Sequence, residues 1–344
     1  MTIIWDFDQS REIDVICMGR VAVDLYSEQI GSSIEESQTF RKYLGGCAGN
    51  IAVGTSRLGL KSSMFSCVGA DAMGNFLTST LQQENVGISL LKKNNRHLTG
   101  LVILGIDPPD HFPLIFYREN CADMQLRSED VDKTFFSKAK SLLITGTGLS
   151  TKSMREVTHL AIETAHIVGT KVIFDLDYRP VLWGVTDKGD GESRYRFSSE
   201  VSDHYKEVLK KCDLIVGTEE EMLIASGQLT IESAITHIRS FTSAPMVLKR
   251  GAKGCWIYFD DMSSPLISKP FSVKILNVLG AGDAFMSGLL RGLLRNETWV
   301  SSAAFANACG AIVVTRHGCA PAMPYFAEMQ HFIEGYENVT VSDT

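Results

Sequence analysis

The sequence has no uninterrupted apolar run of the roughly 18 residues that a membrane-spanning helix needs. Its first residues, MTIIWDFDQSREID, also lack the basic start and the continuous apolar stretch of a secretory signal. These two absences argue against a membrane element and against secretion. We therefore expect a cytoplasmic protein.

Paired cysteines and an excess of basic charge are missing as well. The eight cysteines are scattered and form no C-x-x-C pair, so we expect reduced core side chains and no zinc site. The formal net charge of -7 argues against a nucleic-acid partner, which would favour a basic face. A small phosphorylated ligand is still compatible with this charge, because backbone N–H groups and one or two local cations can hold a phosphate.

Two common nucleotide-binding motifs are absent too. No G-x-x-x-x-G-K-[ST] sequence occurs, which excludes a P-loop NTPase. The window that starts at Gly280 reads G-A-G-D-A-F, so it does not form the G-x-G-x-x-G fingerprint of dinucleotide-binding folds. Neither of these two folds is therefore expected.

What the chain does contain is an alternation of short β-branched runs with helical patterns. This alternation predicts βαβ units and a largely parallel sheet with helices on both faces, where ligands bind beyond the carboxyl ends of the strands. Residues 20–44 and 96–118 depart from it and are interpreted as a small β-lid, although a sheet edge would also explain them. The polar residues 184–200 indicate a loop or mobile insertion. The expected strands are 14–20, 141–148, 171–177, 213–218 and 246–251, and the expected helices are 151–168, 201–211 and 231–241.

Two glycine-rich turns carry polar side chains into expected helices. In N-V-L-G-A-G-D-A-F-M-S-G-L-L (277–290) the helix should start near Gly280, with N–H groups free to bind an anion. Its single carboxylate, Asp283, has a simpler alternative role, since acidic residues favour the first helical turn. In G-G-C-A-G-N (45–50) the amide of Asn50 suits a polyol, but glycine packing is the simpler explanation.

Together these turns resemble the two signature motifs of the PfkB (ribokinase-like) carbohydrate kinases. Three further matches occur in the family's order: C-V-G-A-D-A-M-G (67–74), L-K-R-G-A-K-G-C (248–255) and T-R-H-G-C-A-P-A-M-P (315–324). The resemblance covers residues 13–325. It implies a ribokinase-like three-layer αβα fold with a mostly parallel central sheet and a small β-sheet lid. We expect a single kinase domain over 13–330 and a C-terminal tail over 331–344.

The resemblance also implies roles for the second turn. Asp283 matches the family's catalytic base, and Gly280, Ala281 and Gly282 match its anion hole. ATP and Mg²⁺ are the implied cofactors. The family's N-x-x-E motif reads T-E-E-E here, so Glu221 keeps the acidic, water-mediated metal role while Thr218 replaces the asparagine.

Another departure is Asn277, which stands where the family usually has an acidic residue. This residue helps to form a monovalent-cation site in the family, so the resemblance leaves such a site in this chain open.

Further residues match binding positions of the family. The implied substrate-binding residues are Asp24, Gly45, Gly46, Asn50, Arg118 and Arg179, and the implied nucleotide-binding residues are Lys249, Gly251, Gly254 and Asn307. The two arginines resemble the branch of the family that acts on sugar acids, because a buried arginine needs an anion to meet. The alternative is that each arginine pairs with a protein carboxylate, such as Asp123 or Asp177.

These matches predict an ATP-dependent kinase acting on the terminal hydroxyl of a keto-deoxy sugar acid. The resemblance favours 5-dehydro-2-deoxygluconate of inositol catabolism, converted to its 6-phosphate. A 2-keto-3-deoxygluconate kinase or a fructokinase is the alternative within the same class. A non-catalytic sugar-binding regulator is the alternative from another class, and the intact Asp283 argues against it. The expected partners are the sugar acid and ATP, with a homodimer through the lid as a further expectation.

Overall fold

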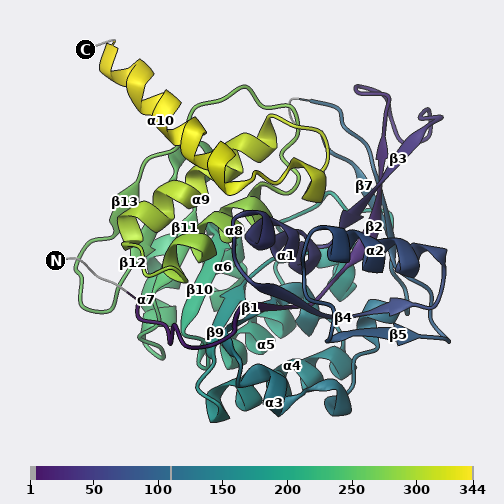
Figure 1. Cartoon of the computed structure of the whole chain (residues 1–344), viewed down its shortest axis with the longest axis horizontal. Coiled ribbons are helices and arrows are strands. Elements are labelled where there is room, and N and C mark those ends of the chain that lie inside the picture. Colours follow the sequence, from purple (N-terminus) through teal and green to yellow (C-terminus); the bar gives the residue numbers. More distant parts are fainter. Residues whose placement is uncertain (1–4, 109–110, 343–344) are drawn as a thin grey trace.

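The computed structural model describes residues 5–108 and 111–342, which fold into two sheets flanked by helices (Figure 1). The strands of the large sheet are β1 (Ile13–Met18), β4 (Ser62–Gly69), β5 (Leu91–Asn94), β8 (Ala139–Thr145), β9 (Lys171–Asp175), β10 (Leu214–Thr218), β11 (Met246–Lys249), β12 (Cys255–Tyr258) and β13 (Leu266–Ser268). The strands of the small sheet are β2 (Ala22–Ser27), β3 (Phe40–Gly45), β6 (Leu101–Leu104) and β7 (Leu114–Tyr117).

The helices from α1 to α7 lie between strands along the chain, and α8, α9 and α10 follow the last strand. They are α1 (Cys47–Arg57), α2 (Ala72–Gln83), α3 (Lys133–Phe136), α4 (Lys152–Ile167), α5 (Ser199–Leu209), α6 (Glu219–Ser226), α7 (Ile231–Arg239), α8 (Ala281–Leu293), α9 (Trp299–Val314) and α10 (Phe326–Ser342). The expected boundary at residue 330 falls inside α10. None of the helices in the described part of the chain combines the length and apolarity needed to cross a membrane.

The large sheet runs in the order β13-β12-β11-β10-β9-β8-β1-β4-β5. All neighbours from β11 to β5 are parallel, whereas β12 and β13 add an antiparallel edge. The mostly parallel sheet expected from the sequence is therefore confirmed. Its parallel strands end at one edge, where α1, α6 and α8 begin.

Both faces of the large sheet are buried, as its β-branched strands require. Along β1, Val15 and Cys17 pack into one core with α1, α2, α8 and α9. Ile16 and Met18 alternate with them and pack into a second core with α4, α5, α6 and α7. The result is the expected three-layer arrangement. All eight cysteines are buried and unpaired, as expected.

The small sheet has the order β3-β2-β6-β7 and projects from one corner of the molecule (Figure 1). It comes from the two segments that the sequence marks as a lid, and β2 and β6 pair in parallel. Tyr26, Val102 and Leu104 pack with Leu279 and Cys319, which joins the lid to the body. A lid sheet is therefore confirmed.

Candidate active site

Helix α8 begins where the sequence predicts. Gly280 is its N-cap residue and has a φ of 84°, in the left-handed region that favours glycine. A Cβ at this position would also lie 2.9 Å from Sγ of Cys319. The first N–H groups of a helix have no partner within it, so the turn at 280–282 presents donors that suit an anion.

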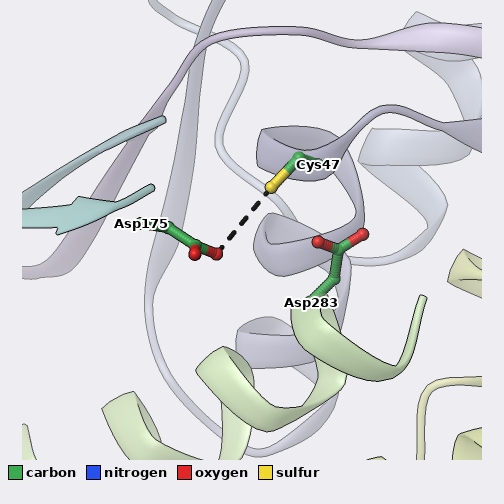
Figure 2. Close-up of side chains that lie close together, drawn as sticks. All are labelled: Cys47, Asp175 and Asp283. Atoms are coloured by element: carbon green, nitrogen blue, oxygen red, sulfur yellow. Dashed lines mark hydrogen bonds between the residues drawn. The ribbon is translucent and has the colours of Figure 1, made fainter. Parts of the chain in front are cut away.

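Asp283 lies in the first turn of α8 and faces the start of α1 (Figure 2). Asn50 donates from Nδ2 to Oδ2 of Asp283 over 2.7 Å. Burial raises the pKa of Asp283, the charge of Asp177 raises it further, and the hydrogen bond from Asn50 lowers it. The carboxylate is therefore held in place and is more basic than an exposed aspartate.

Two other side chains approach Asp283, one from α1 and one from the end of β9 (Figure 2). Ligand atoms of Cys47, Asp175 and Asp283 all lie within 4.8 Å of one another. The Cys47 thiol donates to Oδ2 of Asp175 over 3.9 Å. Magnesium binds oxygen donors and is usually held by one or two carboxylates together with substrate phosphates. Asp175 and Asp283 fit that donor set, whereas the thiol does not.

A chain of charges leads from Asp175 to α6. Lys249 lies 3.0 Å from Oδ1 of Asp175 and 3.7 Å from Oε2 of Glu221. Burial alone would lower the pKa of Lys249, but these two carboxylates raise it above its ordinary value. The lysine is therefore a fixed positive charge at the end of β11.

Glu221 occupies a capping box at the start of α6. Its Oε2 accepts from the Thr218 N–H over 2.8 Å, and Oγ1 of Thr218 accepts from the Glu221 N–H over 3.2 Å. Threonine thus replaces the family's asparagine without loss of the N-cap. Because the carboxylate already binds backbone, Glu221 suits contact with a metal through water better than direct ligation.

The expected substrate residues Asp24, Gly45 and Asn50 lie together at the junction of the lid and α1. A Cβ on Gly45 would lie only 2.0 Å from Oδ2 of Asp24, so glycine leaves the space that this carboxylate fills. Gly46 has a φ of 91°. Burial raises the pKa of Asp24 to about 7, although the charge of Arg20 lowers it. Oδ1 of Asp24 and Oδ1 of Asn50 are buried and have no hydrogen-bond partner among the described residues.

The two expected sugar-acid arginines both pair with protein carboxylates. Nε of Arg118 lies 2.6 Å from Oδ2 of Asp123, and both side chains are buried. Nη2 of Arg179 lies 3.0 Å from Oδ1 of Asp177. The structure therefore contains the alternative pairing that the sequence allows, and Arg179 keeps 23% of its side chain exposed.

The expected nucleotide residues Lys249, Gly251, Gly254 and Asn307 line one cavity of about 380 Å³. Ala281 and Gly282 also line it, so it reaches the 280–282 turn of α8. Phe271, Val314 and other apolar side chains form its walls, which suits a flat aromatic base. Nδ2 of Asn307 donates to the Lys269 carbonyl over 2.9 Å and fixes the strand end beside the cavity.

Sequence reasoning did not identify Arg20, Asp175 or Arg194 as site residues. Arg20 and Asp175 each lie at or just beyond the carboxyl end of a parallel strand, which is the signal that could have found them. Arg194 belongs to the 184–200 segment, which has no helix or strand before Ser199. Burial lowers the pKa of Arg194 to about 10, and the like charge of Arg179 contributes. This loop therefore brings a second cation near Arg179.

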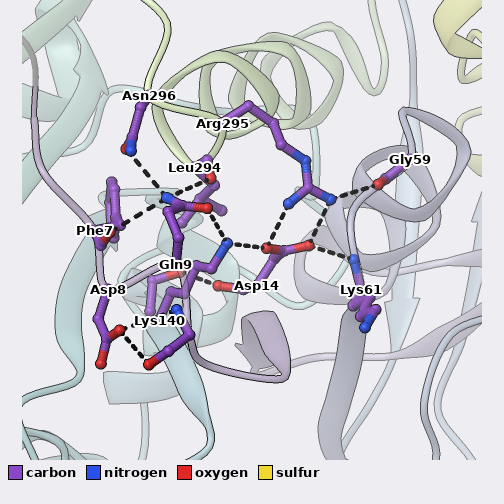
Figure 3. Close-up of polar contacts among 12 residues, drawn as sticks. Phe7, Asp8, Gln9, Asp14, Gly59, Lys61, Lys140, Leu294, Arg295 and Asn296 are labelled. Atoms are coloured by element: carbon purple, nitrogen blue, oxygen red, sulfur yellow. Dashed lines mark hydrogen bonds and ion pairs between the residues drawn. The ribbon is translucent and has the colours of Figure 1, made fainter.

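The opposite end of the sheet holds a different polar cluster (Figure 3). Asp14 is buried, and its carboxylate lies 2.8 Å from Nζ of Lys140 and 3.0 Å from two nitrogens of Arg295. It also accepts from the Lys61 N–H over 2.7 Å. A larger and more open hollow of about 680 Å³ lies nearby, lined by Ile13 and Lys61 among others. None of the expected site residues lines it, and ligands of parallel sheets bind at the other edge.

Comparison with known proteins identifies the family of this chain. Residues 12–325 match the pfkB family of carbohydrate kinases. A Clostridium tetani protein named 5-dehydro-2-deoxygluconokinase is 34% identical over 334 residues, which cover 95% of each chain. The structure of a Vibrio cholerae fructokinase bound to fructose, ADP and calcium has a TM-score of 0.80 and 28% identity, covering 93% of this chain and 98% of that one.

A Xylella fastidiosa fructokinase with bound ATP has the same fold, with a TM-score of 0.80, 22% identity and coverage of 94% of this chain and 99% of that one. The likeness thus extends over nearly the whole length of each protein compared. The chain belongs to the pfkB family of carbohydrate kinases.

Proposed function

We propose that the protein transfers the γ-phosphoryl group of ATP to the terminal hydroxyl of 5-dehydro-2-deoxygluconate and forms its 6-phosphate. The observation that carries this proposal is Asp283, held by Asn50 directly behind the anion-binding turn at 280–282. The name of the Clostridium tetani relative supports this choice of sugar acid.

In the proposed mechanism Asp24 and Asn50 bind hydroxyls of the sugar acid. Their buried, unpartnered oxygens are the acceptors that such hydroxyls would meet. The carboxylate of Asp283 aligns the terminal hydroxyl and accepts its proton as the new P–O bond forms. Phosphoryl transfer depends mainly on alignment and charge stabilisation, so a weak but well-placed base is sufficient.

The remaining site residues act on the nucleotide side of this proposal. The N–H groups of the 280–282 turn stabilise the charge on the transferred phosphoryl group. Lys249 neutralises the phosphates, and Gly251, Gly254 and Asn307 border the space for the base. Asp175, with Glu221 through water, would hold Mg²⁺, which supplies further positive charge to the phosphates.

Arg118 and Arg179 have different roles in the proposed binding of the sugar acid. Arg118 fixes Asp123, whereas Arg179 stays partly exposed and is a secondary contact for the sugar acid. Asn277 has a neutral side chain and so adds no charge near the turn, and its Oδ1 accepts from the Leu279 N–H over 3.0 Å. We therefore expect weak dependence on K⁺, which assays in K⁺ and Na⁺ buffers would measure.

The deciding experiment is a phosphate-transfer assay with ATP and Mg²⁺ over three acceptors. These are 5-dehydro-2-deoxygluconate, 2-keto-3-deoxygluconate and fructose, and NMR locates the phosphate in each product. The highest kcat/KM is expected for the first acceptor, with phosphate on its C6 oxygen. A higher value for either of the others would replace the proposed substrate.

Asp283→Asn tests the catalytic assignment against the non-catalytic regulator. We expect kcat to fall by about 100-fold or more, because proton transfer to a positioned base typically contributes this much. Binding of the sugar acid, measured by calorimetry, should change little. Unaltered turnover in Asp283→Asn would refute the role of this residue as base, and a wild-type protein that binds sugar without turnover would favour the regulator.

A homodimer through the lid belongs to the same proposal. The lid region carries Ile30, Leu98 and Tyr117, whose side chains are 51%, 72% and 57% exposed. Covering these apolar side chains would favour association. Light scattering of the wild-type protein and of Tyr117→Glu measures the oligomeric state.

A further inference from the structure

The side chain of Arg20 is buried and forms no hydrogen bond or ion pair with the other described residues. It lies between β1 and β2, and only 7% of it is exposed. Its Nε is buried and has no hydrogen-bond partner among the described residues. Its guanidinium lies over the ring of Phe116 on the lid, whose centroid is 5.3 Å from Cζ. Removing a charge from water without an acceptor is unfavourable, so this position calls for an anion.

The protein carboxylates near Arg20 do not supply this anion. Asp24 and Asp177 lie close enough for its charge to lower their pKa values, yet neither forms an ion pair with it among the described residues. Asp177 pairs with Arg179, and Asp123 pairs with Arg118. Of these three arginines, Arg20 is therefore the one that lacks a carboxylate of the protein.

The backbone of Arg20 is fixed against the helix that carries Asn50. Its carbonyl accepts from the Gly49 N–H over 3.2 Å, and a Cβ at Gly46 would lie 2.5 Å from that oxygen. Three unpartnered buried atoms thus come from this junction: Nε of Arg20, Oδ1 of Asp24 and Oδ1 of Asn50. A donor with two acceptors complements a ligand that has an anionic group and hydroxyls.

We propose that Arg20 binds the carboxylate of the sugar acid and so determines the preference for acids over neutral sugars. Asp24 and Asn50 take the hydroxyls, while Asp283 meets the terminal hydroxyl at the far end. The stack on Phe116 couples this contact to the lid, because the guanidinium and the ring must stay together. The inference rests on the proposed function, since it names the group of that substrate that Arg20 recognises.

The test compares the sugar acid with its methyl ester, which keeps the hydroxyls and lacks the charge. The wild-type protein should favour the acid. Arg20→Gln should lower kcat/KM for the acid by about 100-fold, as expected when a hydrogen bond to a charged group is lost, and leave the ester unchanged. Arg20→Lys should recover part of the loss, and the KM for ATP should stay constant. Arg41→Gln, which removes an exposed positive charge from the lid, is the matched control and should alter neither substrate.

An Arg20→Gln protein that still prefers the acid over the ester would overturn this assignment. A different result would show that the proposed function is wrong: the wild-type protein would then prefer 2-keto-3-deoxygluconate or fructose. If Arg20→Gln does not fold, a crystal structure of the wild-type protein with the sugar acid decides. A carboxylate within about 3.2 Å of Arg20 nitrogens supports the assignment, and one placed on Arg118 or Arg179 instead overturns it.

Discussion

At the scale of single residues, the chemistry depends on how burial and neighbouring charges act on Asp283. Burial and the charge of Asp177 raise its pKa, so the residue is a better proton acceptor than a solvated aspartate. The hydrogen bond from Asn50 opposes this shift and keeps the carboxylate oriented. The same contact therefore limits basicity and improves alignment.

The raised pKa predicts the pH dependence of activity. In the proposed mechanism catalysis needs the ionised carboxylate, so activity should fall as the pH falls through the pKa of Asp283. The acid limb of kcat/KM should therefore lie above pH 3.8, the ordinary value of an aspartate. A pH–rate profile of the free enzyme measures it. An acid limb at or below the ordinary value would contradict the effect of burial.

The raised pKa of Asp283 also determines whether the folded protein gains or loses stability as the pH rises. The unfolded chain loses this proton at a lower pH than the folded protein, so ionisation of Asp283 lowers the free energy of unfolding as the pH rises. Asp283→Asn should thus be at least as stable as the wild-type protein above neutral pH. Urea titrations at two pH values measure the difference.

Gly45→Ala should disturb the substrate side of the site. The added Cβ would lie 2.0 Å from the carboxylate of Asp24, so this side chain must move. We expect a loss of about 1–3 kcal/mol in unfolding free energy and a higher KM for the sugar acid. Gly189→Ala is the matched control, because nothing lies within 4 Å of its Cβ position. Equal KM values for the two variants would show that Asp24 does not bind substrate.

At the scale of the elements, the site depends on where strands end and helices begin. Local signals predict the start of α8. Glycine adopts the left-handed conformation of Gly280 readily, and Asp283 suits the first helical turn. They predict the lid as well, since its strands lack crossover helices. Which residues at these ends form the site can be predicted only when the relative placement of several elements is known.

The arginines illustrate what local signals leave undecided. Asp123 and Asp177 are near Arg118 and Arg179 in the sequence, so they are evident as alternative partners. Whether an arginine turns toward a near carboxylate or into the cleft depends on the space around it, which only packing settles. The position of Arg20 just after a strand points to the site, but its lack of a partner among the described residues is a property of the folded protein.

Asp14→Asn should affect stability and leave the chemistry intact. The carboxylate joins the ends of β1 and β8 to the segment after α8, through Lys140 and Arg295 (Figure 3). Breaking a buried ion pair leaves an unpaired charge, and we expect a loss of about 3–5 kcal/mol. Thermal unfolding measures the loss, while kcat below the melting temperature should be unchanged. Asp8→Asn, which alters a carboxylate that is 56% exposed, is the control and should change stability much less.

At the scale of the whole molecule, the three-layer body and the lid meet where the proposed substrate residues lie. The body supplies Asp283 and Asp175 on rigid ends of α8 and β9, and the lid supplies Asp24 on β2. The nucleotide cavity belongs to the body alone. Motion of the lid would therefore change the sugar side of the site and leave the nucleotide side in place.

The parallel pairing of β2 with β6 has a consequence for protein engineering. Val23 pairs with Leu101, although α1, β4, α2 and β5 lie between these strands in the chain. The lid is therefore not a continuous insertion that could be excised or transplanted in one piece. A chimera that exchanges substrate preference between relatives must carry both lid segments together, because one segment alone would have to pair with an unmatched strand of its new host.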